Sequence, residues 1–394
     1  MAAPRKARSA SGREAQTRSL SRASERFDLV LLAPDNSLSR AQLLASFAGA
    51  TVVTPFETKG GEAGERMRRI VELNERLLRA LDGRAPLSSL PRGKELVRYG
   101  TALFEALFPG DIRRLWDAAV ARSSGEPVPL VFTSALDWVA GKPWELAFDP
   151  ARRTFLAHGP ATIVRNVFSA VPAEAPHARR GPLRILFAAA RPAGLAPLAA
   201  RREEDALRAA FAPLLARGAA TFEVLSKATP ETLHGKLRSG KFDVFHFVGH
   251  GEYDEEARSG ALLLEDGRGR ARKLSAEALA RLASGRGLLL TVLNACETGR
   301  GGRRDFLRGV APALAHAGLP AVAANQYRVF DDAAAAFAAE LYGALADGQP
   351  VASAFREART GLAGTLGDDA LDWAVPVLYA RNPGCVLCRP GARR

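Results

Sequence analysis

Blocks of apolar residues, separated by amphipathic stretches, predict strands that alternate with helices along most of the chain. Continuous apolar runs at 27–34, 183–190, 242–251 and 287–296 are typical of strands buried on both faces. The segment 39–49 reads as a short helix. One helical face is predicted by the apolar positions Met67, Ile70, Val71, Leu77, Leu78 and Leu81. Such alternation favours an α/β fold with a mostly parallel sheet flanked by helices.

A Pro- and Ala-rich segment without periodicity, residues 170–182, is the best candidate for a domain boundary. We therefore expect an N-terminal α/β half over 27–175 and a second half over 176–384. Residues 1–26 are expected to form a disordered basic tail, and residues 385–394 a C-terminal tail that holds two idle thiols.

The composition is typical of a globular protein and argues against a membrane-spanning one. The chain has 394 residues, of which 47% are hydrophobic and 25% charged, and no apolar run is long enough to span a membrane. Three cysteines and no signal peptide favour a reducing cytoplasm. Residues 1–26 hold seven basic and two acidic residues, so they carry +5 of the net charge of +13. Nucleic acid is therefore expected as a partner only through this tail.

Two predicted strands end in reactive residues. His250 follows the run "HFVG" and Cys296 follows "TVLNA", each just beyond its strand. If the strands are neighbours, both side chains reach the same sheet edge, where an imidazole can deprotonate a thiol. Gly249 and Gly251 give the backbone around His250 freedom to turn. The backbone N–H groups of Gly251 and Cys296 are candidates for an oxyanion hole.

Other motifs give weaker evidence of a functional site. His246 and His250 form H-x-x-x-H, but on a strand they lie about 13 Å apart, too far to share one metal ion. An orienting or structural role is expected for His246. Cys385 and Cys388 supply half of a zinc knuckle without a second half. Trp144 and Glu145 are expected to serve packing and a surface ion pair. We expect no metal and no cofactor.

The motifs together resemble the CHAT domain, a bacterial cysteine peptidase family in the clan of caspases and separases. The resemblance covers roughly residues 90–382 and rests on "KPWELAFD", "FHFVGHG", "ALLLED", "TVLNACETG", "GLPAVAANQY" and "WAVPVLY". It implies a caspase-like sandwich in which a degenerate half, without a Cys/His pair, precedes the catalytic half.

The resemblance also assigns roles. It implies that His250 is the general base, Cys296 the nucleophile and Gly251 the oxyanion glycine, and that His246 and Asn294 flank them. Asn294 then lines the pocket for the substrate residue before the cut bond.

Two acidic residues in the segment after the next strand, Asp331 and Asp332, match the region that holds a substrate arginine in separase-like relatives. Their alternative role is to cap the helix that follows. Self-cleavage in the Gly/Arg-rich loop 299–304 would support the preference for a basic residue.

The function implied is a cytoplasmic cysteine endopeptidase in bacterial signalling, regulated cell death or antiphage defence. Its partners would be a protein substrate and an activating sensor or partner protein. Many members of the family carry tetratricopeptide repeats as their sensor, and this chain has none, so the activating signal would have to come from another protein. The alternative is a catalytically silent interaction scaffold with the same fold. Retention of both His250 and Cys296 favours the enzyme.

Overall fold

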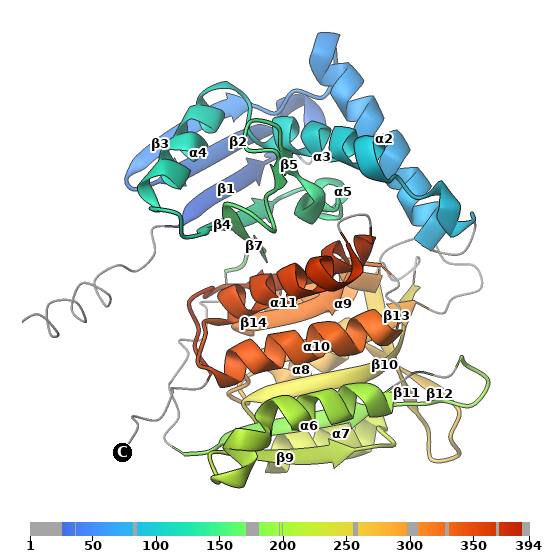
Figure 1. Ribbon diagram of the computed structural model, residues 1–394. Coiled ribbons are helices and arrows are strands. Elements are labelled where there is room, and N and C mark those ends of the chain that lie inside the picture. The colour runs from blue at the N-terminus through green and yellow to red at the C-terminus, as the bar shows by residue number, and fades with distance from the viewer. Residues whose placement is uncertain are drawn as a thin grey trace, which may run out of the picture.

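The fold is shown in Figure 1 as a computed structural model. It describes residues 26–35, 37–81, 85–170, 181–196, 198, 200–254, 259–297, 306–327, 331–367 and 370–387. The expected basic tail, residues 1–26, therefore lies outside the described residues except for Arg26.

One mostly parallel sheet of 13 strands runs through both halves of the chain. Its main path follows the order β12-β11-β10-β13-β14-β15-β7-β4-β1-β2-β3, and β8 joins β10 and carries β9 on its other edge. The predicted α/β class is confirmed. The strands of this sheet are β1 (Phe27–Leu32), β2 (Gln42–Phe47), β3 (Ala50–Pro55), β4 (Val128–Ser134), β7 (Ala161–Asn166), β8 (Leu183–Ala189), β9 (Ala220–Leu225), β10 (Val244–Asp254), β11 (Ser259–Glu265), β12 (Ala271–Ser275), β13 (Leu290–Glu297), β14 (Ala321–Asn325) and β15 (Pro376–Ala380).

Helices cover both faces of the C-terminal part of the sheet (Figure 1). Buried side chains of α6 (Ala200–Ala216), α10 (Asp331–Ala346) and α11 (Val351–Leu366) pack into one core. Those of α7 (Pro230–Ser239), α8 (Ala276–Ala283) and α9 (Phe306–His316) pack into a second core on the opposite face. This two-sided cover explains why the strands between them are continuously apolar. The N-terminal half carries α2 (Gly61–Leu81), α3 (Gly93–Leu107), α4 (Gly110–Arg122) and α5 (Asp137–Ala140).

Short elements complete the chain. The hairpin expected around Asp149-Pro150 is present as β5 (Phe148–Asp149) and β6 (Thr154–Phe155). Single 3-10 turns are η1 (Leu38–Arg40), η2 (Leu87–Ser89), η3 (Trp144–Leu146) and η4 (Leu371–Ala374).

The helix expected over 39–49 was wrong, because this segment forms β2 after the turn η1. Leu43, Ala45 and Phe47 are buried while their neighbours are not, which is the period of two of a strand. Ala48 and Gly49 both have positive φ, 49° and 87°, and such a two-residue turn joins β2 to β3 in a tight hairpin.

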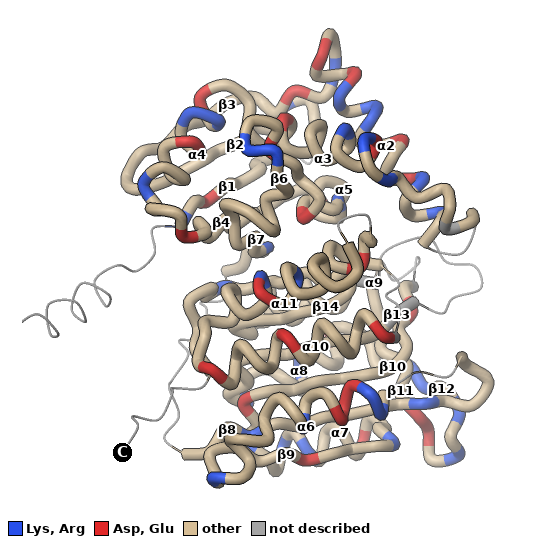
Figure 2. Tube along the Cα trace, viewed as in Figure 1, with Lys and Arg blue, Asp and Glu red and all other residues tan. Residues whose placement is uncertain are grey.

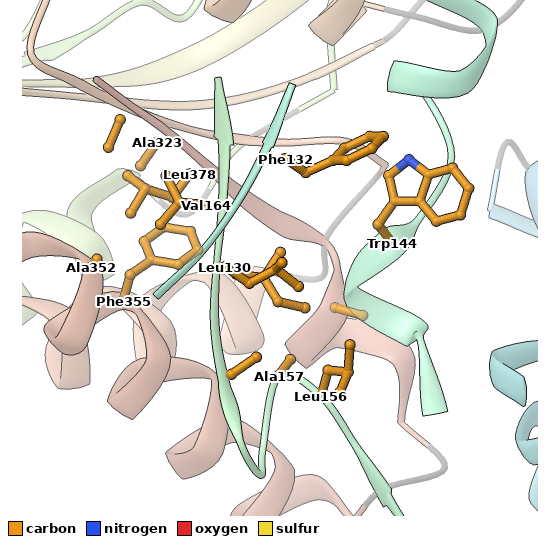
Figure 3. Close-up of a cluster of buried hydrophobic side chains, with 14 of the residues drawn as sticks. Leu130, Phe132, Trp144, Leu156, Ala157, Val164, Ala323, Ala352, Phe355 and Leu378 are labelled. Atoms are coloured by element: carbon orange, nitrogen blue, oxygen red, sulfur yellow. The ribbon is translucent and has the colours of Figure 1, made fainter. Parts of the chain in front are cut away.

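The two halves share a core. β7 lies parallel to β15 with Arg165 opposite Tyr379, which makes the sheet continuous. Figure 3 shows buried side chains of one cluster around this joint, with Leu130 and Val164 from the N-terminal half and Phe355 and Leu378 from the C-terminal half. Most of the expected boundary lies outside the described residues, so it stays a prediction.

Residues near the C-terminus belong to the packed structure. Cys385 is only 2% exposed, and its carbonyl oxygen accepts the N–H of Val351 at the start of α11. Burial raises the pKa of its thiol to about 11. The C-terminal tail was expected to begin here, and its bounds stay a prediction; a buried thiol with a raised pKa is consistent with the idle thiol expected at Cys385. Cys388 lies outside the described residues.

Among the described helices, none combines the length and the apolar composition needed to cross a membrane.

Candidate active site

The sheet aligns the two residues expected to form the dyad. β10 and β13 are parallel neighbours, and their register places His250 directly opposite Cys296. Both strands continue past these positions, to Asp254 and Glu297, so the two residues lie within strands and not just beyond them. Neighbouring strands are about 4.8 Å apart, so the two backbone positions are adjacent.

His250 also marks the point where β10 changes its partner on the other edge. Up to Val248 this edge pairs with β8, and from His250 onward it pairs antiparallel with β11. Gly249 lies at the change. A Cβ atom there would come within 2.3 Å of the Phe247 ring, so this position accepts only glycine without rearrangement.

The His250 side chain is buried and is oriented by the backbone. Its Nε2 lies 2.9 Å from the carbonyl oxygen of Ala196, which can only accept a hydrogen bond, so Nε2 carries the proton. Nδ1 is buried without a hydrogen-bond partner among the described residues. Burial lowers the pKa of His250 below its ordinary value, and the bond to Ala196 offsets part of this. The imidazole is therefore neutral at neutral pH, with the lone pair on Nδ1.

His246 lies four residues earlier on β10 and is 1% exposed. Its Nδ1 is 2.8 Å from the hydroxyl of Tyr342 on α10, and its Nε2 is 2.9 Å from Oε2 of Glu203 on α6. The Phe187 ring stacks on the imidazole with ring centroids 5.3 Å apart. These contacts fix the strand against both covering helices. His246 is thus part of a structural network and has no described contact with His250.

The network continues to the neighbouring strands. Asn294 donates from Nδ2 to Oε1 of Glu203, and Asn325 on β14 donates to Oδ1 of Asn294 at 2.7 Å. Glu203, His246, Asn294, Asn325 and Tyr342 are called the strand network below. Glu203 was not singled out from the sequence, although it occupies a buried position of an amphipathic helix.

The other expected site residues lie nearby on the same elements. Gly251 faces Leu262 on β11 and Glu297 on β13 in the sheet register. Asp331 and Asp332 begin α10, and Asp332 forms an exposed ion pair with Arg202 on α6. The side chains of Cys296 and Asp331 and the loop 299–304 lie outside the described residues.

A second buried polar cluster was not predicted from the sequence, because Glu145 was expected on the surface. Glu145 is 0% exposed, and Arg165 binds both of its oxygens, at 3.0 and 2.5 Å. Gln326 bonds to both residues, and Arg359 lies 3.5 Å from the carboxylate. Burial raises the pKa of Glu145, but the two guanidinium groups outweigh this and lower it. Glu145, Arg165, Gln326 and Arg359 are called the joint cluster.

Metal ligation has no support in the part of the chain that the structure describes, where no three His, Cys, Asp or Glu residues cluster suitably. His246 is committed to Glu203 and Tyr342, and His250 to Ala196.

A family model described as CHAT domain matches residues 97–381. Among solved structures, separase in its complex with securin, from Saccharomyces cerevisiae, shares 12% identity with a TM-score of 0.45; the match covers 90% of this chain and 30% of that chain. Caspase-1 from Spodoptera frugiperda shares 14% identity with a TM-score of 0.35, over 54% of this chain and 93% of its own. No curated protein matches the chain.

Proposed function

This chain belongs to the CHAT domain family, and from that premise we propose that it is a cysteine endopeptidase with Cys296 and His250 as its catalytic dyad. The observation that carries the proposal is the register of β10 and β13, which aligns these two positions on adjacent strands. Strand alternation also puts position 296 on the same sheet face as Asn294, and His250 on the same face as His246.

The hydrogen bonding of His250 supports its role as the base. Because Nε2–H donates to Ala196, the lone pair for proton transfer is on Nδ1, which has no described partner. Burial lowers the pKa of His250, which favours an unprotonated Nδ1 at neutral pH. The resting pair is then a neutral thiol and a neutral imidazole.

The reaction follows from this state. Nδ1 of His250 takes the Sγ proton of Cys296 as the sulfur attacks the carbonyl carbon of the scissile peptide. The negative charge on the carbonyl oxygen is stabilised by the backbone N–H groups of Gly251 and Cys296. The C–N bond breaks, and the imidazolium gives its proton to the departing amine. Water then attacks the thioester, His250 again acts as base, and the free thiol is regenerated.

For the substrate we propose a protein cut after a basic residue. Asn294, Asp331 and Asp332 would line the pocket for that residue. Asp332 already engages the guanidinium of Arg202, which is the interaction that a substrate arginine would make.

The proposed function also includes a cellular setting. We propose that the enzyme acts in the cytoplasm of a bacterium, in signalling, regulated cell death or antiphage defence, under an activating sensor or partner protein. The basic tail is the segment proposed for any contact with nucleic acid.

The test measures the reactivity of the Cys296 thiol. Full-length protein and a His250→Ala variant are treated with iodoacetamide across a pH series, and adducts are located by mass spectrometry. Cys296 should label much faster than Cys385, whose pKa is raised to about 11 by burial, and the His250 variant should slow only Cys296. Equal rates at both cysteines, unaffected by His250→Ala, would exclude the dyad and favour the interaction scaffold.

A further inference from the structure

One carboxylate of the strand network bridges the two strands that carry the proposed dyad. Oε2 of Glu203 lies 2.9 Å from Nε2 of His246 on β10, and Oε1 accepts a hydrogen bond from Nδ2 of Asn294 on β13. His246 precedes His250 by four residues on β10, and Asn294 precedes Cys296 by two on β13. Because side chains alternate along a strand, positions 246, 250, 294 and 296 lie on the same face of the sheet. Glu203 therefore ties the two strands together beside the dyad.

The hydrogen bonds of the strand network all run toward Glu203. A carboxylate only accepts hydrogen bonds, so His246 donates from Nε2 and Asn294 donates from Nδ2. Nδ1 of His246 is then left to accept from the hydroxyl of Tyr342. Oδ1 of Asn294 likewise accepts from Asn325. One carboxylate thus sets the orientation of an imidazole on β10 and of an amide on β13.

The segment that carries Glu203 also holds the imidazole of His250. Glu203 lies in the first turn of α6, and the carbonyl oxygen of Ala196, which precedes α6, accepts the Nε2–H of His250 at 2.9 Å. The start of α6 is therefore connected to His250 by one hydrogen bond and to the two dyad strands by two more. A shift of this segment would move Nδ1 of His250 relative to position 296.

Folding alone does not require a carboxylate at position 203. Glu203 is 3% exposed and shares its helical face with Leu207 and Phe211, which are both apolar. Burial of a carboxylate costs free energy, and the strand network holds no arginine or lysine to offset that cost. An apolar side chain would fill the same face of α6 without it. The carboxylate adds the fixed orientation of its two partners.

From these contacts we propose that Glu203 is a positioning residue for the reaction of Cys296 with His250 as its base. It holds β10, β13 and the start of α6 so that Nδ1 of His250 is in place to take the thiol proton. None of the described hydrogen bonds of Glu203 is to His250, so the effect passes through the strands and α6. The inference rests on the proposed function, because it needs the dyad.

The test follows alkylation of Cys296 by iodoacetamide in the full chain between about pH 6.5 and 8, with adducts located by mass spectrometry. The wild-type rate should change little over this range, because a neutral imidazole assists a neutral thiol throughout. Without assistance only the thiolate reacts, and its fraction rises more than about tenfold over this range for a pKa of about 8.5. Glu203→Ala should lower the rate at pH 7 by at least about tenfold and give the steep pH profile of His250→Ala.

Two further variants separate positioning from folding. In the His250→Ala background, Glu203→Ala should cause no further loss of rate, because its effect acts through His250. Glu203→Gln should recover most of the wild-type rate. Its amide can accept from Asn294 and donate to His246 once that imidazole takes its other tautomer.

The matched control is Asp149→Ala, which also removes a buried carboxylate that has two partners. Asp149 is 0% exposed and binds Arg113 and Arg152 in the N-terminal half, at 3.1 and 2.7 Å. At a temperature where circular dichroism shows each variant to be folded, Asp149→Ala should keep the wild-type rate at Cys296 and its pH profile.

The outcomes distinguish the positioning role from the proposed function. A wild-type Cys296 that labels no faster than Cys385 would remove the proposed function, and the positioning role with it. If the wild type shows the His250-dependent rate and Glu203→Ala keeps that rate and its flat pH profile, the dyad stands and the positioning role is overturned. An equal loss from Glu203→Ala with and without His250 would also overturn it, since the effect would not pass through the base.

Discussion

The joint cluster and the strand network are both buried and polar, but they differ in charge. The joint cluster sets one carboxylate, Glu145, between two guanidinium groups, Arg165 and Arg359. The strand network sets one carboxylate, Glu203, beside an imidazole and an amide, with no arginine or lysine among its members. Figure 2 shows the wider contrast, with many charged residues along α2 and few along the central strands.

The comparison shows that the ion pairs of the joint cluster lie away from His250. Full ion pairs lie at the joint, where they hold two halves together and where burial lowers the pKa of Arg359 to about 10. The described partner of His250 is a backbone carbonyl, so its pKa is set by burial and not by a neighbouring ion. The His250 imidazole is therefore kept neutral by burial, whereas the charges of the joint cluster stabilise the contact between the two halves.

The largest effect should come from His250, the proposed general base. His250→Ala removes the proton acceptor, so kcat/KM on a peptide substrate should fall by about 10²–10⁴. The matched control is His158→Ala in the N-terminal half, where the ring packs 4.0 Å from the Trp373 ring centroid. That change should lower thermal stability but leave kcat/KM nearly intact at a temperature where the variant is folded. Equal losses in both variants would contradict the assignment.

The second effect breaks the joint cluster. Glu145→Ala leaves two buried guanidinium groups uncompensated, and we expect it to lower the free energy of unfolding by about 3–5 kcal/mol in urea titrations. Glu223→Ala is the control, because Glu223 pairs with Lys236 while both side chains are partly exposed, and should cost about 0–1 kcal/mol. A loss below about 1 kcal/mol for Glu145→Ala would show that the joint does not depend on the cluster.

Lowering the pH should reduce the stability that the joint cluster contributes. The pKa of Glu145 is lower in the folded than in the unfolded state, so its stabilising contribution is present above its ordinary pKa and is lost as the pH falls through the folded value. The difference in unfolding free energy between the wild type and Glu145→Gln should shrink as the pH drops below about 4. A difference that stays constant with pH would contradict the sign.

A third, smaller effect concerns the strand network. Glu203→Ala leaves His246 and Asn294 each without one partner, and we expect a loss of about 1–3 kcal/mol in unfolding free energy. Glu203→Gln keeps one donor and one acceptor, so it should recover part of this loss. If Gln and Ala cost the same, the hydrogen bonds of Glu203 contribute little beyond its packing.

These clusters also show how far the sequence could be read. Continuous apolar runs predicted β8, β10 and β13 because a strand buried on both faces is mostly apolar. The run at 27–34 also predicted β1, although only every second residue of β1 is buried. The segment that forms β2 was mistaken for a helix because a short run of apolar residues fits either period. Its turn at Ala48-Gly49 held the signal for a hairpin.

The polar clusters were harder to predict because their partners are distant in sequence. Glu145 pairs with Arg165 and Arg359, which lie 20 and 214 residues further along the chain. A lone glutamate is most often exposed, so its burial could not be inferred without the topology. Glu203 left a clearer trace, since it occupies the same helical face as Leu207 and Phe211.

The smallest effect separates the two roles of Asp332. Its ion pair with Arg202 has side-chain exposures of 84% and 66%, so breaking it should change the free energy of unfolding by at most about 1 kcal/mol. If Asp332 receives a substrate arginine, Arg202 competes for the same carboxylate. Arg202→Ala should then lower KM for peptides with arginine before the cut bond, and Asp332→Asn should raise it.

The same peptides with leucine in place of arginine supply the control, because they offer no guanidinium to Asp332. Their KM should be unchanged in both variants, so the ratio of the two substrates isolates the carboxylate–guanidinium contact from any change in folding. A ratio that neither variant shifts would leave Asp332 with a structural role in the first turn of α10, where a carboxylate is favourable, and the acidic residue of the pocket would have to be sought on another element. Opposite shifts in the two variants would instead place the pocket between α6 and α10, on the face that also carries the strand network.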